Sequence, residues 1–176
     1  MGKGILIGIL IAIIGFIAGG YAFVKEGCMP ANADAPPPIL ERWMARTSLR
    51  ASIKRDAPQT PNPVALTDAH LIAGIKLYAQ NCAVCHGAAG GEASNIAKGL
   101  YQHAPQLAKH GVEDDPDGKI YWIVKHGIRL TGMPAFSPTL GEEQIWQLAL
   151  FLKHMDSLPP AAQKAWKALP SAASPS

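Results

Sequence analysis

The chain has 176 residues, 48% of them hydrophobic, and a formal net charge of +3. This length suits one domain plus attachments. The basic excess lies in residues 1–64, with seven Lys or Arg against four Asp or Glu, whereas residues 65–176 hold nine of each. A neutral C-terminal region argues against nucleic acid binding, which needs a basic face on the folded domain.

The N-terminus carries an uncharged stretch, residues 4–24, rich in Ile and Leu. It is long enough to span a bilayer, and it exceeds the apolar core of about 7–15 residues of a signal peptide. We expect residues 1–25 to form a single-pass anchor in the inner (cytoplasmic) membrane, with the remainder on the periplasmic or extracytoplasmic side because Lys3 favours a cytoplasmic N-terminus. Cleavage at the A-x-A-like triplet Ala31-Asn32-Ala33 would instead release a soluble protein.

Residues 26–65 are expected to form a proline-rich linker that contains one short helical segment, residues 39–55. Basic residues recur every four positions in this segment and would share one helix face: Arg42, Arg46, Arg50 and Lys54. Such a stripe suits anionic lipid headgroups or an acidic subunit, and the alternative is a solvated spacer. Cys28 is interpreted as an incidental thiol beside the anchor, with lipidation or an intermolecular disulfide as the other options.

The region 66–158 predicts three helices and no strand, so the expected fold class is all-α. The first covers residues 68–81 with Thr67 as its N-cap, and the second covers 116–126 with Asp115 as a cap. The third begins with the capping-box pattern of residues 139–142 and ends near His154. The long loops 87–115 and 128–138 are expected to wrap a bound group. No function is assigned to the tail, residues 159–176, where a short helix is expected around residues 163–169.

The stretch Cys82-Ala83-Val84-Cys85-His86 is the attachment motif of a c-type haem. Its two thiols form thioether links to the haem, and His86 ligates the iron. A zinc site needs four ligands, and the only other cysteine is Cys28, far away in the sequence. A thioredoxin-like pair would need a βαβ surround. The sequence therefore predicts one covalently bound haem c with its iron.

Met133 is the expected second iron ligand, in a loop made rigid by Gly132 and Pro134. A thioether paired with histidine raises the reduction potential and suits electron transfer. The competing ligands are His103, His110 and His126, which lie near polar residues or at a helix end. The predicted metal ligands are His86 and Met133.

The stretches C-A-V-C-H and G-I-R-L-T-G-M-P-A-F together make residues 66–158 resemble a class I c-type cytochrome of the bacterial, membrane-anchored, monohaem kind. The resemblance implies a helical domain around one haem, in which Gly74 and Tyr78 cross the last helix against Leu148 and Phe151. It also implies that the Pro105 carbonyl accepts a hydrogen bond from His86. The residues expected to contact the haem are Tyr78, Pro105, Leu107, Trp122, Arg129 and Pro134. For Trp122 the alternative is core packing, and for Arg129 a surface charge.

The expected function is membrane-tethered transfer of single electrons between a redox protein donor and an acceptor in membrane complexes. No enzymatic activity, nucleic acid or small-molecule substrate is expected. The alternatives are a fixed haem subunit of a larger membrane oxidoreductase, a haem sensor or small catalytic haem protein in which Met133 leaves the iron, and a protein whose motif never receives haem.

Overall fold

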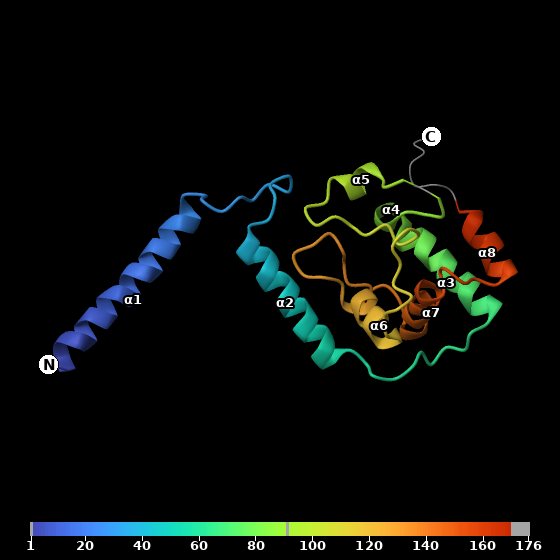
Figure 1. The fold of residues 1–176 in the computed structure, drawn as a ribbon, viewed down its shortest axis with the longest axis horizontal. Coiled ribbons are helices and arrows are strands. Elements are labelled where there is room, and N and C mark those ends of the chain that lie inside the picture. The colour runs from blue at the N-terminus through green and yellow to red at the C-terminus, as the bar shows by residue number, and fades with distance from the viewer. Residues whose placement is uncertain (1, 91, 170–176) are drawn as a thin grey trace. The chain divides into compact units, whose positions relative to one another are not determined.

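A computed structural model describes residues 2–90 and 92–169 of the chain (Figure 1). Within these residues the fold is all-α and contains no strand. The chain divides into two compact units, residues 1–35 and residues 36–176. The helices are α1 (Gly2–Lys25), α2 (Ile39–Asp56), α3 (Asp68–Asn81), α4 (Ala83–His86), α5 (Asn95–Lys98), α6 (Asp117–His126), α7 (Glu142–Lys153) and α8 (Pro160–Lys167).

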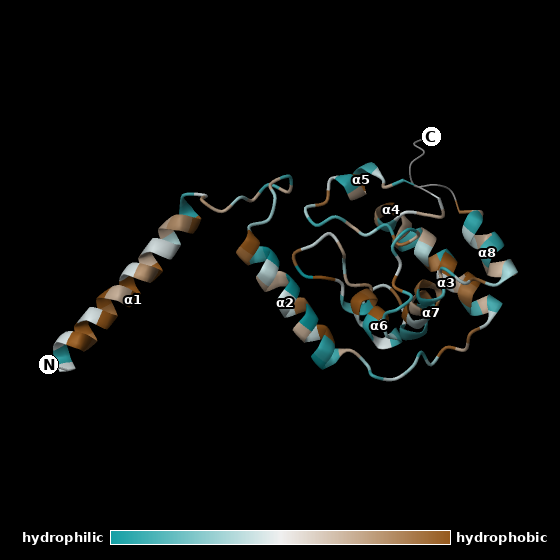
Figure 2. Cartoon of the chain, in the orientation of Figure 1, coloured by the Kyte–Doolittle hydropathy of each residue, from teal (hydrophilic) through white to brown (hydrophobic). Residues whose placement is uncertain are grey.

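The first unit is the helix α1 and the segment that follows it. Apolar residues occur on all sides of α1, none of them buried (Figure 2). At 1.5 Å per residue the helix is about 36 Å long, against about 30 Å for the hydrocarbon core of a bilayer. By length and composition α1 can therefore cross a membrane, a test that an N-terminal signal sequence also passes.

The core of the second unit is the crossing of α3 and α7, the most extensive contact between helices. A Cβ atom at Gly74 would overlap the Gln147 carbonyl oxygen and lie 2.8 Å from the Cβ of Phe151, so only glycine permits this approach. One turn along α3, the rings of Tyr78 and Phe151 meet edge to face with centroids 5.4 Å apart. Leu148 is fully buried beside them. The crossing expected from the resemblance is confirmed.

Two further helices complete this core. α6 packs against α7, where the ring of Tyr121 stacks on Trp146 with centroids 3.9 Å apart. α8 packs against α3, and its Trp166 contacts the rings of Tyr78 and Phe151 at 5.4 and 5.2 Å. α8 begins at Pro160, earlier than expected for this tail helix, because proline is favoured in the first turn of a helix.

Two expected helix starts differ from the structure. α6 begins at Asp117, with Pro116 as its N-cap, and the Asp115 carboxylate pairs with Lys119 instead of capping the helix. α7 begins at Glu142, the last of the four residues expected to open it. Its N-cap is Gly141, whose N–H donates to Gln144 Oε1 at 2.9 Å, so the capping interaction lies two residues later than expected.

The segment that joins α2 to α3 lies on the second unit as a strap, residues 57–64. Ala57 is buried, and the carbonyl of Pro58 lies against Gly118 at the start of α6. Asn62 accounts for most of the polar contacts, since its backbone N–H donates to Asp117 Oδ2 at 3.1 Å and its side-chain amide donates to the Trp146 carbonyl at 3.0 Å. These bonds attach residues expected to be linker directly to α6 and α7.

Candidate functional site

The motif cysteines and His86 lie where α3 gives way to the single turn α4. The Cys82 N–H still donates to the Tyr78 carbonyl at 2.8 Å, and the His86 N–H donates to the Cys82 carbonyl at 2.9 Å. The Tyr78 hydroxyl donates to the Gly87 carbonyl at 2.7 Å and so holds the end of α4 against the core. Burial raises the pKa of this tyrosine, which keeps the hydroxyl protonated as a donor.

The loop after α4 fixes the orientation of the His86 ring. Nδ1 of His86 lies 2.9 Å from the carbonyl oxygen of Pro105, and a carbonyl can only accept, so Nδ1 carries the proton. Nε2 of the neutral ring then keeps its lone pair for a metal. The Leu107 N–H donates to the His86 carbonyl at 3.2 Å, and Gln106 Nε2 donates to the Cys85 carbonyl at 3.1 Å. Burial lowers the pKa of His86, which favours the neutral, ligating form.

The two motif thiols are half-buried and are not joined by a disulfide. Burial, reinforced by the neighbouring Cys85, raises the pKa of Cys82 to about 12. Metal binding by cysteine requires the thiolate. A thiol held neutral in an apolar wall suits a covalent carbon–sulfur bond better than the coordination of zinc.

Met133 is held in a closed turn that returns the chain to the end of α6. Gly127 has φ 64° and ψ −167°, a region that is essentially restricted to glycine. A Cβ atom there would lie 2.5 Å from the carbonyl carbon of Pro134 and 2.6 Å from the carbonyl oxygen of Met133. The Ile128 N–H donates to the Met133 carbonyl at 3.2 Å. Thr131 Oγ1 accepts from the Met133 N–H at 3.1 Å and donates to the Ile128 carbonyl at 2.7 Å.

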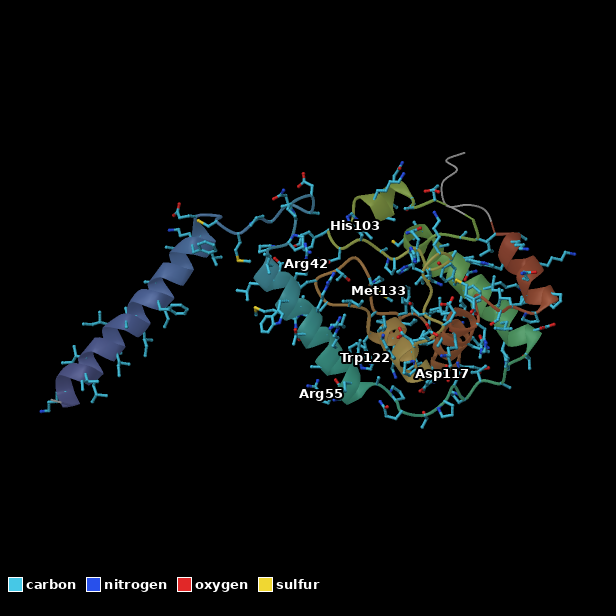
Figure 3. All side chains as sticks on the ribbon, viewed as in Figure 1. Arg42, Arg55, His103, Asp117, Trp122 and Met133 are labelled. Atoms are coloured by element: carbon cyan, nitrogen blue, oxygen red, sulfur yellow. The ribbon has the colours of Figure 1, made fainter. Side chains whose placement is uncertain are left out.

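These elements enclose one apolar cavity of about 260 Å³. The α4 turn, the loop 100–107, the inner face of α6 and the Met133 loop all contribute to its wall, and Figure 3 labels Met133 and His103 among the lining residues. The cavity brings together eight residues predicted from the sequence: Tyr78, Cys82, Cys85, His86, Pro105, Leu107, Met133 and Pro134.

Two predicted haem contacts, Trp122 and Arg129, do not line the cavity. The ring of Trp122 packs on His126 at 5.1 Å, and Figure 3 shows it on the α6 surface toward α2. Arg129 is exposed. Of the competing histidines, His103 lines the cavity, whereas His110 and His126 do not.

The sequence reasoning missed the α6 and α7 parts of the wall. Ile120, Ile123 and Val124 line the cavity from α6, and Leu152 lines it from α7. The apolar spacing on α6 was a readable signal, since residues three and four apart share a helix face. Such spacing predicts a buried face but does not indicate whether that face borders a cavity.

The donor set fits a covalently bound haem c with its iron. Two thiols, an imidazole with a free Nε2 and a thioether surround one apolar space, and together they match the attachment and ligation chemistry of this cofactor. Cys82 and Cys85 would hold this group covalently.

Comparison with known families agrees with this chemistry. Residues 69–152 match the family model described as cytochrome C oxidase, cbb3-type, subunit III. The matched segment contains most of α3, the C-x-x-C-H motif, the Met133 loop and nearly all of α7. It is a haem-binding, electron-transfer domain. Residues 69–152 therefore form a c-type cytochrome domain of class I.

Proposed function

We propose that this protein is a membrane-tethered carrier of single electrons between redox protein partners, and that His86 and Met133 would ligate its haem iron. The observation that carries the proposal is the shared cavity, in which both side chains and both motif thiols face one apolar space. Two protein ligands leave no open position for a substrate, so electron transfer is favoured over catalysis.

Each protein group has a distinct role in this proposal. The haem, when bound, supplies reversible one-electron chemistry at its iron. The Pro105 carbonyl keeps His86 in its ligating tautomer and increases the basicity of the ring. The turn closed by Thr131 holds Met133 in place in both oxidation states. The apolar wall from α6 excludes water, which favours a high reduction potential.

The proposed tether is α1, with the haem domain on the extracytoplasmic side. Because residues 57–64 and α2 lie on the haem domain, the connection from α1 to this body is the segment 26–38. Thirteen residues extend to at most about 50 Å. Confinement within that radius of the anchor corresponds to a local concentration of a few millimolar, which favours repeated encounters with membrane partners.

A second candidate function is that of a fixed haem subunit in a larger membrane oxidoreductase. The observation that favours it is the family description, which names a subunit of a cbb3-type oxidase. Purification in mild detergent separates the two. A carrier is expected to elute alone, and a fixed subunit is expected to elute with other membrane proteins at constant stoichiometry.

The proposal is tested by a spectroscopic redox titration of the full-length holoprotein and of two methionine variants. For the wild type we expect a high-potential, one-electron, low-spin haem with the methionine–iron charge-transfer band when oxidised. Met133→Ala should abolish this band, lower the potential and allow the reduced protein to bind carbon monoxide. Met155→Leu is the matched control, because Met155 is buried in the core and does not line the cavity. Carbon monoxide binding by the wild type, or an unchanged band in Met133→Ala, would refute the ligand assignment.

A further inference from the structure

α2 is the element that neither the haem site nor the family match explains. It precedes the matched residues, yet it is attached to the haem domain along one side. The hydroxyl of Tyr101, in the loop beside the cavity, donates to Glu41 Oε1 at 2.5 Å. Leu49 and Ile53 are half-buried on the same side, and α2 contacts α6. At 100° per residue these positions define an inner face of α2.

The opposite, outer face of α2 has no partner among the described residues. Its first two turns expose four large apolar side chains: Ile39 at 90%, Leu40 at 64%, Trp43 at 62% and Met44 at 56%. A cluster of this kind marks a contact surface, whereas single exposed apolar residues do not. Figure 2 shows the start of α2 coloured as hydrophobic and its later turns as mainly hydrophilic.

Positive charge follows the apolar cluster along the same face. Arg46, Arg50 and Lys54 are all exposed, and Arg50 and Lys54 continue the line of Leu40 and Trp43 at helical spacing. At 100° per residue Arg42 falls on the inner side of α2, where its side chain is still exposed. The salt bridges of the described residues involve none of these four side chains, so their charge is available to a partner.

We propose that the outer face of α2 binds an anionic bilayer surface and thereby holds the haem domain in one orientation against the membrane. This inference rests on the membrane anchoring in the proposed function. The tether of residues 26–38 delivers the apolar end of α2 to within about 50 Å of the point where α1 leaves the bilayer. Tryptophan favours the level of the lipid headgroups, and arginine and lysine are attracted to acidic lipids beyond them. The inner face transmits the orientation through Glu41 and Tyr101.

The test uses the full-length holoprotein in nanodiscs of phosphatidylcholine alone or of phosphatidylcholine with one quarter phosphatidylglycerol. Nitroxide labels are placed singly by Thr47→Cys, an exposed position one turn after Trp43 on the outer face of α2, by Ile14→Cys in α1 and by Gln163→Cys on the exposed face of α8, each combined with Cys28→Ser. Collision with oxygen, which concentrates in lipid, is compared with collision with a water-soluble nickel complex. The protein is kept reduced so that the low-spin iron is diamagnetic.

We expect the label at residue 47 to shift toward the lipid-like values of residue 14 in the acidic discs, while residue 163 stays aqueous. Added salt should reverse the shift, because salt screens charge. Arg46→Gln, Arg50→Gln and Lys54→Gln should each lower the ratio of lipid-bound to aqueous label about fivefold.

Two results would overturn the proposal. One is an aqueous label at residue 47 in both kinds of disc. The other is a label immobilised equally in both without gain in oxygen collision, which would mean contact with protein. The label at residue 14 and the haem spectrum report anchoring and cofactor binding in the same samples, so a failure of the proposed function is recognised separately.

Discussion

Gly127→Ala tests whether the backbone at the end of α6 keeps Met133 in position. Alanine at φ 64° and ψ −167° raises the free energy of the native state by about 1–3 kcal/mol. Its methyl group would also overlap the backbone of Met133 and Pro134, which no change of rotamer relieves. Overpacking of this kind adds about 1–3 kcal/mol, so we expect a total destabilisation of about 2–6 kcal/mol.

The matched control is Gly90→Ala, because Gly90 also has a positive φ, of 68°, but a methyl group added there would meet nothing within 4 Å. It should show only the conformational cost, about 1–3 kcal/mol. Urea titration followed by circular dichroism measures both free energies of unfolding. The methionine–iron charge-transfer band should weaken or disappear in Gly127→Ala and persist in Gly90→Ala. Equal free energies of unfolding together with an intact band in both variants would refute the claim that the backbone at Gly127 keeps Met133 in position.

Gly74→Ala forces α3 and α7 apart and should lower the free energy of unfolding by about 1–3 kcal/mol in urea titrations. Gly99→Ala is the control, because an added methyl group would meet its nearest atom at 3.6 Å, and it should stay within about 0.5 kcal/mol of the wild type. Trp166→Ala should cost about 3–5 kcal/mol in the same assay, and an unchanged midpoint would contradict the place of α8 in the core. The hydrogen bond to Glu41 raises the pKa of Tyr101, so this contact should be intact below about pH 10 and be lost as the pH rises through the raised value. The difference between ultraviolet titrations of the wild type and of Tyr101→Phe measures the pKa of Tyr101. A pKa at or below the ordinary tyrosine value would contradict the hydrogen bond to Glu41.

The helices could be predicted from the sequence because their signals are local. Thr67 caps α3 as expected, through a hydrogen bond from the His70 N–H, and α3 has the expected bounds. The start of α6 was misplaced by one residue, since Asp115 had two possible roles and the nearby Lys119 determined which one it took. Local patterns identify a helix, whereas tertiary partners determine its ends.

The docking of α2 and of the strap could not be predicted in this way. Asn62 bonds to Asp117 and to Trp146, which are 55 and 84 residues further along the chain. A proline-rich composition indicates an extended backbone but not what that backbone lies against. The candidate site also combines features that local sequence determines with features that tertiary packing determines. Cys82, Cys85 and His86 could be predicted because they form a local motif. The outward position of Trp122 could not, because it depends on how α6 is rotated in the fold.

The crossing at Gly74 also has a consequence for the order of assembly. A ribosome delivers α3 and the C-x-x-C-H motif before α7, whose Phe151 covers Tyr78 from 73 positions further along the chain. Contacts between segments so distant in sequence form late, since the intervening loop must first close. The aromatic ring of Tyr78, one turn before Cys82, therefore stays uncovered until the last helices arrive. Docking of α7 and α8 then closes the cluster of Tyr78, Phe151 and Trp166.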